Sequence, residues 1–155
     1  MRHMTIFRKP PGLILLQLSL RLGGAITMTI GAAHLFFPTM GYEGAVRDGM
    51  SPPIQDHFYY LATYAIAAFL LALGAISLFF SRLDHLPSAV AVACVLAVLW
   101  SARLLLELAY PVQVPLFHVL RPSTFILPVI AIMAALYAMA VLANGPTLLR
   151  LGRAP

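Results

Sequence analysis

The sequence contains few charged residues. Only 10% of its 155 residues are charged, against about 25% in soluble globular proteins, and 61% are hydrophobic. The mean hydropathy is +0.91. A chain with this little polar surface cannot cover a water-soluble fold of its size. The composition therefore excludes an ordinary soluble domain and predicts a membrane protein.

Cysteine is nearly absent, and the histidines lack a metal-binding pattern. Cys94 is the only cysteine, which excludes an intrachain disulfide and a CxxC metal site and is typical of a small core residue. No HxxxH or HExxH spacing occurs, so the sequence predicts neither a metal site nor a haem. The net charge of +5 comes without any basic stretch interleaved with aromatic residues, and we expect no nucleic-acid binding.

The sequence does contain four long apolar stretches. They cover residues 13–37, 57–80, 88–110 and 124–143, and an outer loop is expected at 38–56. Crossing the hydrocarbon core of a bilayer takes about 20 helical residues, and open strands would leave backbone groups unpaired in lipid. The sequence therefore predicts an all-α protein with one transmembrane domain, residues 1–155, folded as an antiparallel four-helix bundle in the lipid bilayer.

Basic residues indicate the orientation of this bundle. The basic N-terminus is similar to a signal peptide, but Arg21 interrupts the apolar stretch and no small-x-small cleavage site follows, so we expect a retained helix. Because Lys and Arg accumulate in cytoplasmic segments, the distribution of the basic residues predicts that both termini lie inside. The predicted inner segments hold Arg2, Arg8, Lys9, Arg82, Arg150 and Arg153, and the outer loops hold Arg47 and Arg121.

Polar and small residues recur at helical spacing within the four stretches. In the third, Trp100, Arg103, Glu107 and Tyr110 share one face, which continues inward through small and apolar residues. The expected faces are Ala89, Ala93 and Leu96 in the third stretch; Gln17, Leu20, Gly24, Thr27, Gly31 and His34 in the first; His57, Tyr60, Tyr64, Ala67 and Ala68 in the second; and Thr124, Ala131, Ala134 and Ala138 in the fourth. Small residues let helices approach closely in lipid, so we expect a tightly packed inner half and an outer half opened by larger polar side chains.

The outer polar residues form a candidate ligand site. Its members are His34, Tyr60, Tyr64, Trp100, Arg103, Glu107 and His118. A charge inside a membrane helix points to a function by default, although Arg103 and Glu107 can equally form a structural ion pair. Tyr and Trp near a membrane surface can form an aromatic belt without any further role. The pattern assigns no catalytic residue.

Two further residues in these stretches carry local structural predictions. Asp56 is interpreted as the N-cap of the second helix rather than as half of a catalytic dyad with His57. Pro128 is expected to kink the fourth helix or to leave a free carbonyl near its outer end.

The first stretch resembles the opening helix of the DoxX-like membrane proteins. The resemblance rests on Leu20-Arg21-Leu22-Gly23 and Gly31-Ala32-Ala33-His34-Leu35-Phe36, with Arg21, Gly31 and His34 matching the family's opening pattern. It implies four transmembrane helices in a bacterial inner membrane and a link to quinone-dependent respiration and redox stress, often as a partner of other proteins. It supplies no catalytic set.

Three functions remain open from the sequence. The first is a small accessory or binding protein that holds a lipophilic ligand such as a quinone, with Arg103 and His34 donating hydrogen bonds and Glu107 orienting Arg103. The second is a membrane enzyme acting on an isoprenoid or sterol-like lipid, as in the EXPERA group of isomerases; Arg103 should hold Glu107 ionised, which counts against it. The third is a structural subunit that packs against a membrane-protein partner or against further copies of itself.

Overall fold

Four long helices make up the described part of the chain. The computed structural model describes residues 10–36, 52–83, 86–111 and 121–151, with side chains described within 10–36, 60–83, 86–111 and 121–146. The helices are α1 (Pro11–His34), α3 (Pro52–Phe80), α4 (Leu86–Ala109) and α5 (Ser123–Leu151). All four are long and apolar enough to cross a membrane, which confirms the predicted all-α membrane bundle. The protein is therefore a multi-pass membrane protein.

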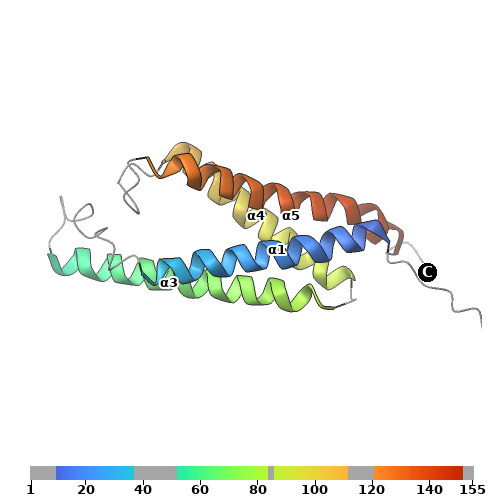
Figure 1. The fold of residues 1–155 in the computed structure, drawn as a ribbon, viewed down its shortest axis with the longest axis horizontal. Coiled ribbons are helices and arrows are strands. Elements are labelled where there is room, and N and C mark those ends of the chain that lie inside the picture. The colour runs from blue at the N-terminus through green and yellow to red at the C-terminus, as the bar shows by residue number, and fades with distance from the viewer. Residues whose placement is uncertain (1–9, 37–51, 84–85, 112–120, 152–155) are drawn as a thin grey trace, which may run out of the picture.

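Two antiparallel helix pairs build the bundle. α1 packs along α3, and α4 packs along α5, while α1 also contacts α5 (Figure 1). The C-terminal ends of α1 and α4 and the N-terminal ends of α3 and α5 lie together at one end, which we call the outer end after the predicted orientation. The opposite end, where α1 begins and α5 finishes, is called the inner end. The two pairs diverge toward the outer end (Figure 1).

The ends of the helices differ from the predicted limits for physical reasons. α3 begins at Pro52, ahead of the expected residue 57, because prolines are tolerated in the first turn, where backbone N–H groups have no helical partner. Asp56 therefore lies inside α3, and its predicted role as the N-cap is wrong. α1 ends at His34 instead of Phe37, and residues 35 and 36 form a turn.

α5 also differs from its predicted limits, because it runs through both of its prolines. Pro128 and Pro146 lie inside the helix, which continues to Leu151 although each ring removes one backbone hydrogen bond. The Asn144 amide donates to the carbonyls of Ala140, at 2.8 Å, and of Gly12 in α1, at 2.9 Å. The bond to Gly12 joins α5 to the start of α1, one residue beyond the predicted end of the fourth apolar stretch at residue 143.

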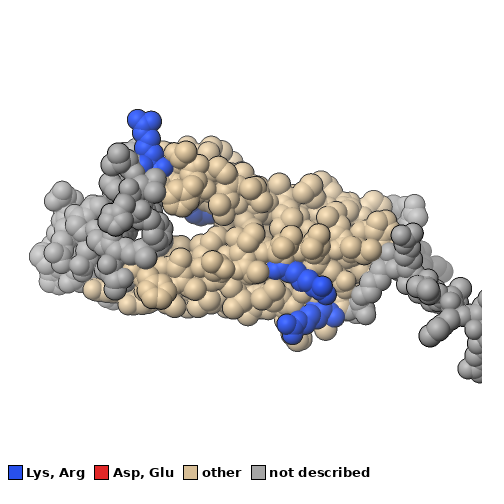
Figure 2. All heavy atoms as spheres, in the orientation of Figure 1, with Lys and Arg blue, Asp and Glu red and all other residues tan. Residues whose placement is uncertain are grey.

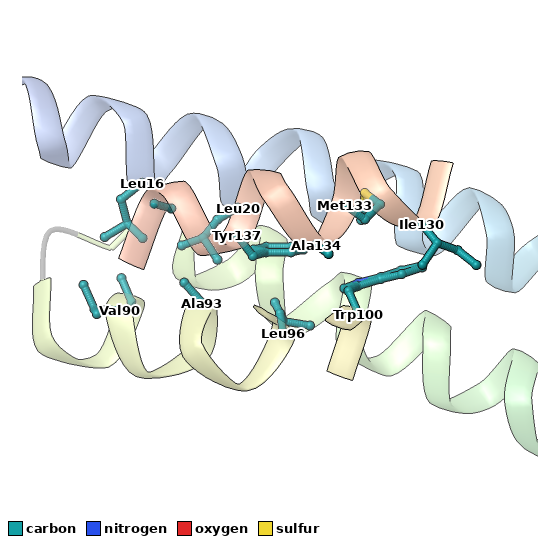
Figure 3. Packing of buried hydrophobic residues seen from close by; sticks show 12 residues of the cluster. Leu16, Leu20, Val90, Ala93, Leu96, Trp100, Ile130, Met133, Ala134 and Tyr137 are labelled. Atoms are coloured by element: carbon teal, nitrogen blue, oxygen red, sulfur yellow. The ribbon is translucent and has the colours of Figure 1, made fainter. Parts of the chain in front are cut away.

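The buried apolar cluster lies toward the inner end. It joins α1, α4 and α5 (Figure 3) through Leu16, Leu20, Ala89, Val90, Ala93, Leu96, Trp100, Ile130, Met133, Ala134, Tyr137 and Ala140. Trp100 and Ile130 are the labelled members nearest the outer end (Figure 3). The predicted face of α4 is confirmed through its inner half. Cys94, predicted to be a core residue, is partly buried against this cluster.

Hydroxyl groups connect three helices in the middle of the bundle. The Ser77 hydroxyl donates to the carbonyl of Leu20 at 2.8 Å. Because that bond uses the only proton of Ser77, the hydroxyl of Tyr137, 3.2 Å away, donates to the Ser77 oxygen. Tyr137 is fully buried, and a Cβ atom at Gly23 would clash with its hydroxyl. Gly23 therefore provides the space that lets α5 approach α1.

The predicted faces of α1 and α3 have different outcomes. In α1, the predicted residues Gln17, Leu20, Gly24, Thr27 and Gly31 are buried. Within residues 60–80 of α3, the buried residues are Thr63, Ala67, Gly74 and Ser77, while Tyr60, Tyr64 and Ala68 are exposed. The predicted α3 face is therefore confirmed at Ala67 and wrong at Tyr60, Tyr64 and Ala68. Of the predicted α5 face, Ala134 is buried, Ala131 and Ala138 are partly buried, and Thr124 is exposed. Met133 and Tyr137 lie at the centre of the buried face.

Candidate functional site

A hollow separates the two helix pairs in their outer halves. Figure 2 shows it between the α1/α3 side and the α4/α5 side, with basic side-chain atoms visible inside it. Arg103 is the only Lys or Arg within residues 23–34, 60–70, 97–109 and 123–135, the outer halves of the four helices. It lies six residues before the end of α4, which corresponds to about 9 Å along the helix axis. Arg103 is therefore the one cationic side chain within these described ranges, and it lies inside a helix long and apolar enough to cross a membrane.

Glu107 forms the fixed part of this polar site. Its side chain is 1% exposed, and its two carboxylate oxygens accept different donors. The Arg103 guanidinium donates through Nη2 to Oε2 at 2.7 Å, and the Ser123 hydroxyl donates to Oε1 at 2.8 Å. The spacing of four residues places Arg103 and Glu107 on one face of α4, while Ser123 begins α5. The carboxylate therefore links the two helices and orients Arg103, as the spacing predicted for the ion pair.

Arg103 keeps donors for another partner. Its side chain is 42% exposed, and one of its five N–H groups is used by Glu107. Within the described part of the chain, the structure gives its guanidinium no second acceptor. Because a cation in lipid is stable only when paired or hydrated, the remaining donors favour contact with an acceptor atom from outside the helix.

His34 is the last residue of α1 and therefore lies at the outer end of the bundle, where α4 also ends (Figure 1). The His34 Nδ1 atom is 2.8 Å from the carbonyl oxygen of Ile30 and must carry a proton to bond to it. In the neutral ring Nε2 is then an acceptor. The donor role predicted for His34 would therefore require a doubly protonated ring.

Trp100 lies at the outer limit of the buried cluster. It is 6% exposed and lies one helical turn inward from Arg103 in α4. Its ring extends from α4 toward Ile130 of α5 (Figure 3). Trp100 is therefore part of the packed interior and offers little surface to a ligand.

The tyrosines predicted for the site lie at the surface of the bundle. Tyr60 and Tyr64 are both exposed, and their rings stack on each other with centroids 6.1 Å apart and planes 12° apart. Tyr110 is 79% exposed at the end of α4. These positions match an aromatic belt at the membrane surface. His118 and the side chain of His57 fall outside the described residues.

Ser123 was missed by the sequence analysis. It is the first residue of α5 and follows Pro122, a pattern that marks a helix start and gives no sign of a partner on another helix. A buried carboxylate must have more than one donor, so the presence of Glu107 in α4 was the available signal that a hydroxyl on a neighbouring helix would face it.

Comparison with known proteins gives no relative for this chain. No family model, no curated protein and no solved structure matches it. The resemblance of its first helix to the DoxX-like proteins therefore stays a prediction.

Proposed function

We propose that this protein is a small accessory or ligand-binding protein of the bacterial inner membrane, which holds a lipophilic molecule in the hollow at its outer end. An isoprenoid quinone is the ligand class that we favour. The proposal rests on the position of Arg103 beside the hollow. Glu107 holds the Arg103 guanidinium through one N–H group, and the other N–H groups of Arg103 remain available for a ligand. A carbonyl oxygen is a suitable acceptor for these donors.

The surroundings of Arg103 support a ligand with an apolar body. The helices that border the hollow are apolar over most of their length. Binding sites for small molecules are usually concave and largely apolar, with a few polar groups that fix the orientation of the ligand. The outer half of this bundle has these properties.

The contacts of Glu107 weigh against the isomerase hypothesis. An acid that moves protons must change its protonation state during the reaction. Both oxygens of Glu107 already accept hydrogen bonds, from Arg103 and from Ser123, so neither oxygen is placed to exchange a proton with a ligand. We therefore favour binding over catalysis.

Native mass spectrometry of the protein released from mild detergent tests this proposal. We compare the wild type with Arg103→Ala and with Arg82→Ala, which removes an exposed cation near the inner end. We expect a small organic adduct on the wild type and on Arg82→Ala, and its loss from Arg103→Ala. The mass of the adduct identifies the ligand class.

A different result would favour a structural role over ligand binding. Bare protein in all three samples, or a mass that reports only self-association, would favour a subunit that packs against other membrane proteins. In that case Arg103→Ala should disturb assembly, because the pair with Glu107 would serve only to join α4 to α5 through Ser123.

A further inference from the structure

Besides orienting Arg103, Glu107 places a negative charge beside the site where a ligand would bind. We infer that Glu107 determines charge selectivity in the hollow, so that the site accepts a neutral head group with a carbonyl oxygen and disfavours a carboxylate or phosphate. This inference rests on the proposed ligand-binding function and narrows the class of ligand. It concerns the head group alone, because the helices around the hollow are apolar and suit many hydrocarbon chains.

Within the described outer halves of the four helices, the charges sum to zero. Arg103 and Glu107 are the only Lys, Arg, Asp or Glu within residues 23–34, 60–70, 97–109 and 123–135. Arg121, which precedes α5, is exposed, so that water and salt screen its charge. A ligand in the hollow therefore meets an ion pair and not an isolated cation.

The carboxylate of Glu107 keeps its negative charge close to any head group bound by Arg103. It is 1% exposed, and its bonds to Ser123 and Arg103 hold it in place. A guanidinium group is compact, so an acceptor on its unused N–H groups lies on the order of 5 Å from the carboxylate bound to Nη2. In a medium of low dielectric, two negative charges at that separation repel each other strongly.

A neutral carbonyl avoids this repulsion. It accepts a hydrogen bond from Arg103 and brings no net charge next to Glu107, so the existing ion pair stays intact. An anion would have to compete with Glu107 for the same guanidinium, and Glu107 has the advantage of a fixed position and a second donor in Ser123. Without the charge of Glu107, Arg103 would be an uncompensated cation and would prefer an anion.

The test uses two probes that differ only in the head group. A long-chain 2-alkanone and the fatty acid with the same number of carbons are mixed in equal amounts, at a pH well above the pKa of the acid. Native mass spectrometry then gives the ratio of the two adducts for the wild type and for Glu107→Gln, which keeps the size of the side chain and an oxygen that can accept from Ser123. Arg82→Gln is the control for a change of net charge by one unit.

We expect the wild type and Arg82→Gln to carry the ketone at least about tenfold more often than the acid, and Glu107→Gln to prefer the acid. Acid binding equal to or stronger than ketone binding by the wild type would overturn the charge selectivity and leave the ligand-binding function standing. An unchanged ratio in folded Glu107→Gln would also overturn it. Binding of neither probe to the wild type would overturn the proposed function together with the inference.

The wild-type ratio decides the question even if Glu107→Gln does not fold. In that case Arg103→Lys supplies the second variant, because it keeps the positive charge and has fewer donors. It should bind the ketone more weakly and still discriminate against the acid. Loss of the discrimination with Glu107 in place would overturn the inference.

Discussion

The inner and outer halves of this bundle are built from the same four helices and pack in opposite ways. In the inner half, α1, α4 and α5 close around Tyr137, and hydroxyl and amide groups join neighbouring helices. In the outer half the two helix pairs diverge (Figures 1 and 2). There the buried carboxylate of Glu107 joins α4 to α5, within one pair, through Ser123. The protein therefore combines a closely packed inner half with an open outer end.

Side-chain size explains this difference better than hydrophobicity does. Lipid is as apolar as the interior of the bundle, so burial of apolar surface gives little drive for helices to associate within the membrane. Close approach depends instead on small residues and on hydrogen bonds between helices, as at Gly23 and Ser77. At the outer end Arg103 needs room for a long charged side chain, and the pairs separate.

The largest difference in stability between the two halves is expected at Tyr137. We predict that Tyr137→Ala lowers the free energy of unfolding by about 3–5 kcal/mol, because the side chain is fully buried and its removal leaves a cavity in the inner half. The control is Tyr64→Ala in the outer half. Tyr64 is 47% exposed, and its removal should change stability by less than about 1 kcal/mol.

Titration with a denaturing detergent, followed by tryptophan fluorescence, measures both variants. Trp100 is the only tryptophan and belongs to the buried cluster, so its emission reports on the inner half directly. Equal losses of stability for Tyr137→Ala and Tyr64→Ala would contradict the division into a packed half and an open half.

A smaller effect is expected where α1 and α3 touch backbone to backbone. A Cβ atom at Gly74 would lie 2.9 Å from the carbonyl oxygen of Gly24 and 2.9 Å from the backbone nitrogen of Met28. Gly74→Ala must therefore push the helices apart, and we predict a loss of about 1–3 kcal/mol in the same titration. Overpacking of this kind lowers stability only where the helices are in close contact, so its size reports how closely α1 and α3 pack.

Gly145→Ala is the matched control for this glycine. It introduces the same methyl group into another helix, at a position with no neighbouring atom within 4 Å. Because alanine is the better helix former, the variant should be neutral or slightly more stable, by up to about 1 kcal/mol. A loss at Gly145 as large as the loss at Gly74 would show that steric contact is not the cause.

The sequence predicted the spans, the close packing of the inner half, and the polar face of α4. These features follow from long apolar runs, from small residues at helical spacing, and from the four-residue separation of Arg103 and Glu107. They are local properties of one helix, and a single sequence records them directly.

The faces of α3 and α5 could not be predicted in the same way. In a membrane helix the lipid-facing and buried sides are both apolar, so periodicity of hydrophobic residues does not separate them. Alanine occurs on both sides of α3, with Ala67 buried and Ala68 exposed. The polar rings of Tyr60 and Tyr64 favoured the wrong face, because an aromatic residue at a membrane surface is stable without burial.

The contact between Ser123 and Glu107 depends on which helices become neighbours. The two residues are separated by 16 positions and by the end of one helix, and only the pairing of α4 with α5 brings them together. The hollow depends on the same pairing, because it exists only where α4 and α5 diverge from α1 and α3. Such features follow from the arrangement of the helices and not from the pattern within any one of them.

Photolabelling is the most direct test of the claim that the open half of the bundle binds a lipophilic ligand. A long-chain ketone with a photoreactive group beside the carbonyl is crosslinked to the protein in mild detergent, with and without an excess of the unlabelled ketone. We expect the labels removed by the unlabelled ketone to lie in the outer halves of α1 and α4, around His34 and Arg103, and to disappear in Arg103→Ala. Labels that the competitor does not remove, or that map to the packed inner half around Leu16 and Val90, would contradict it.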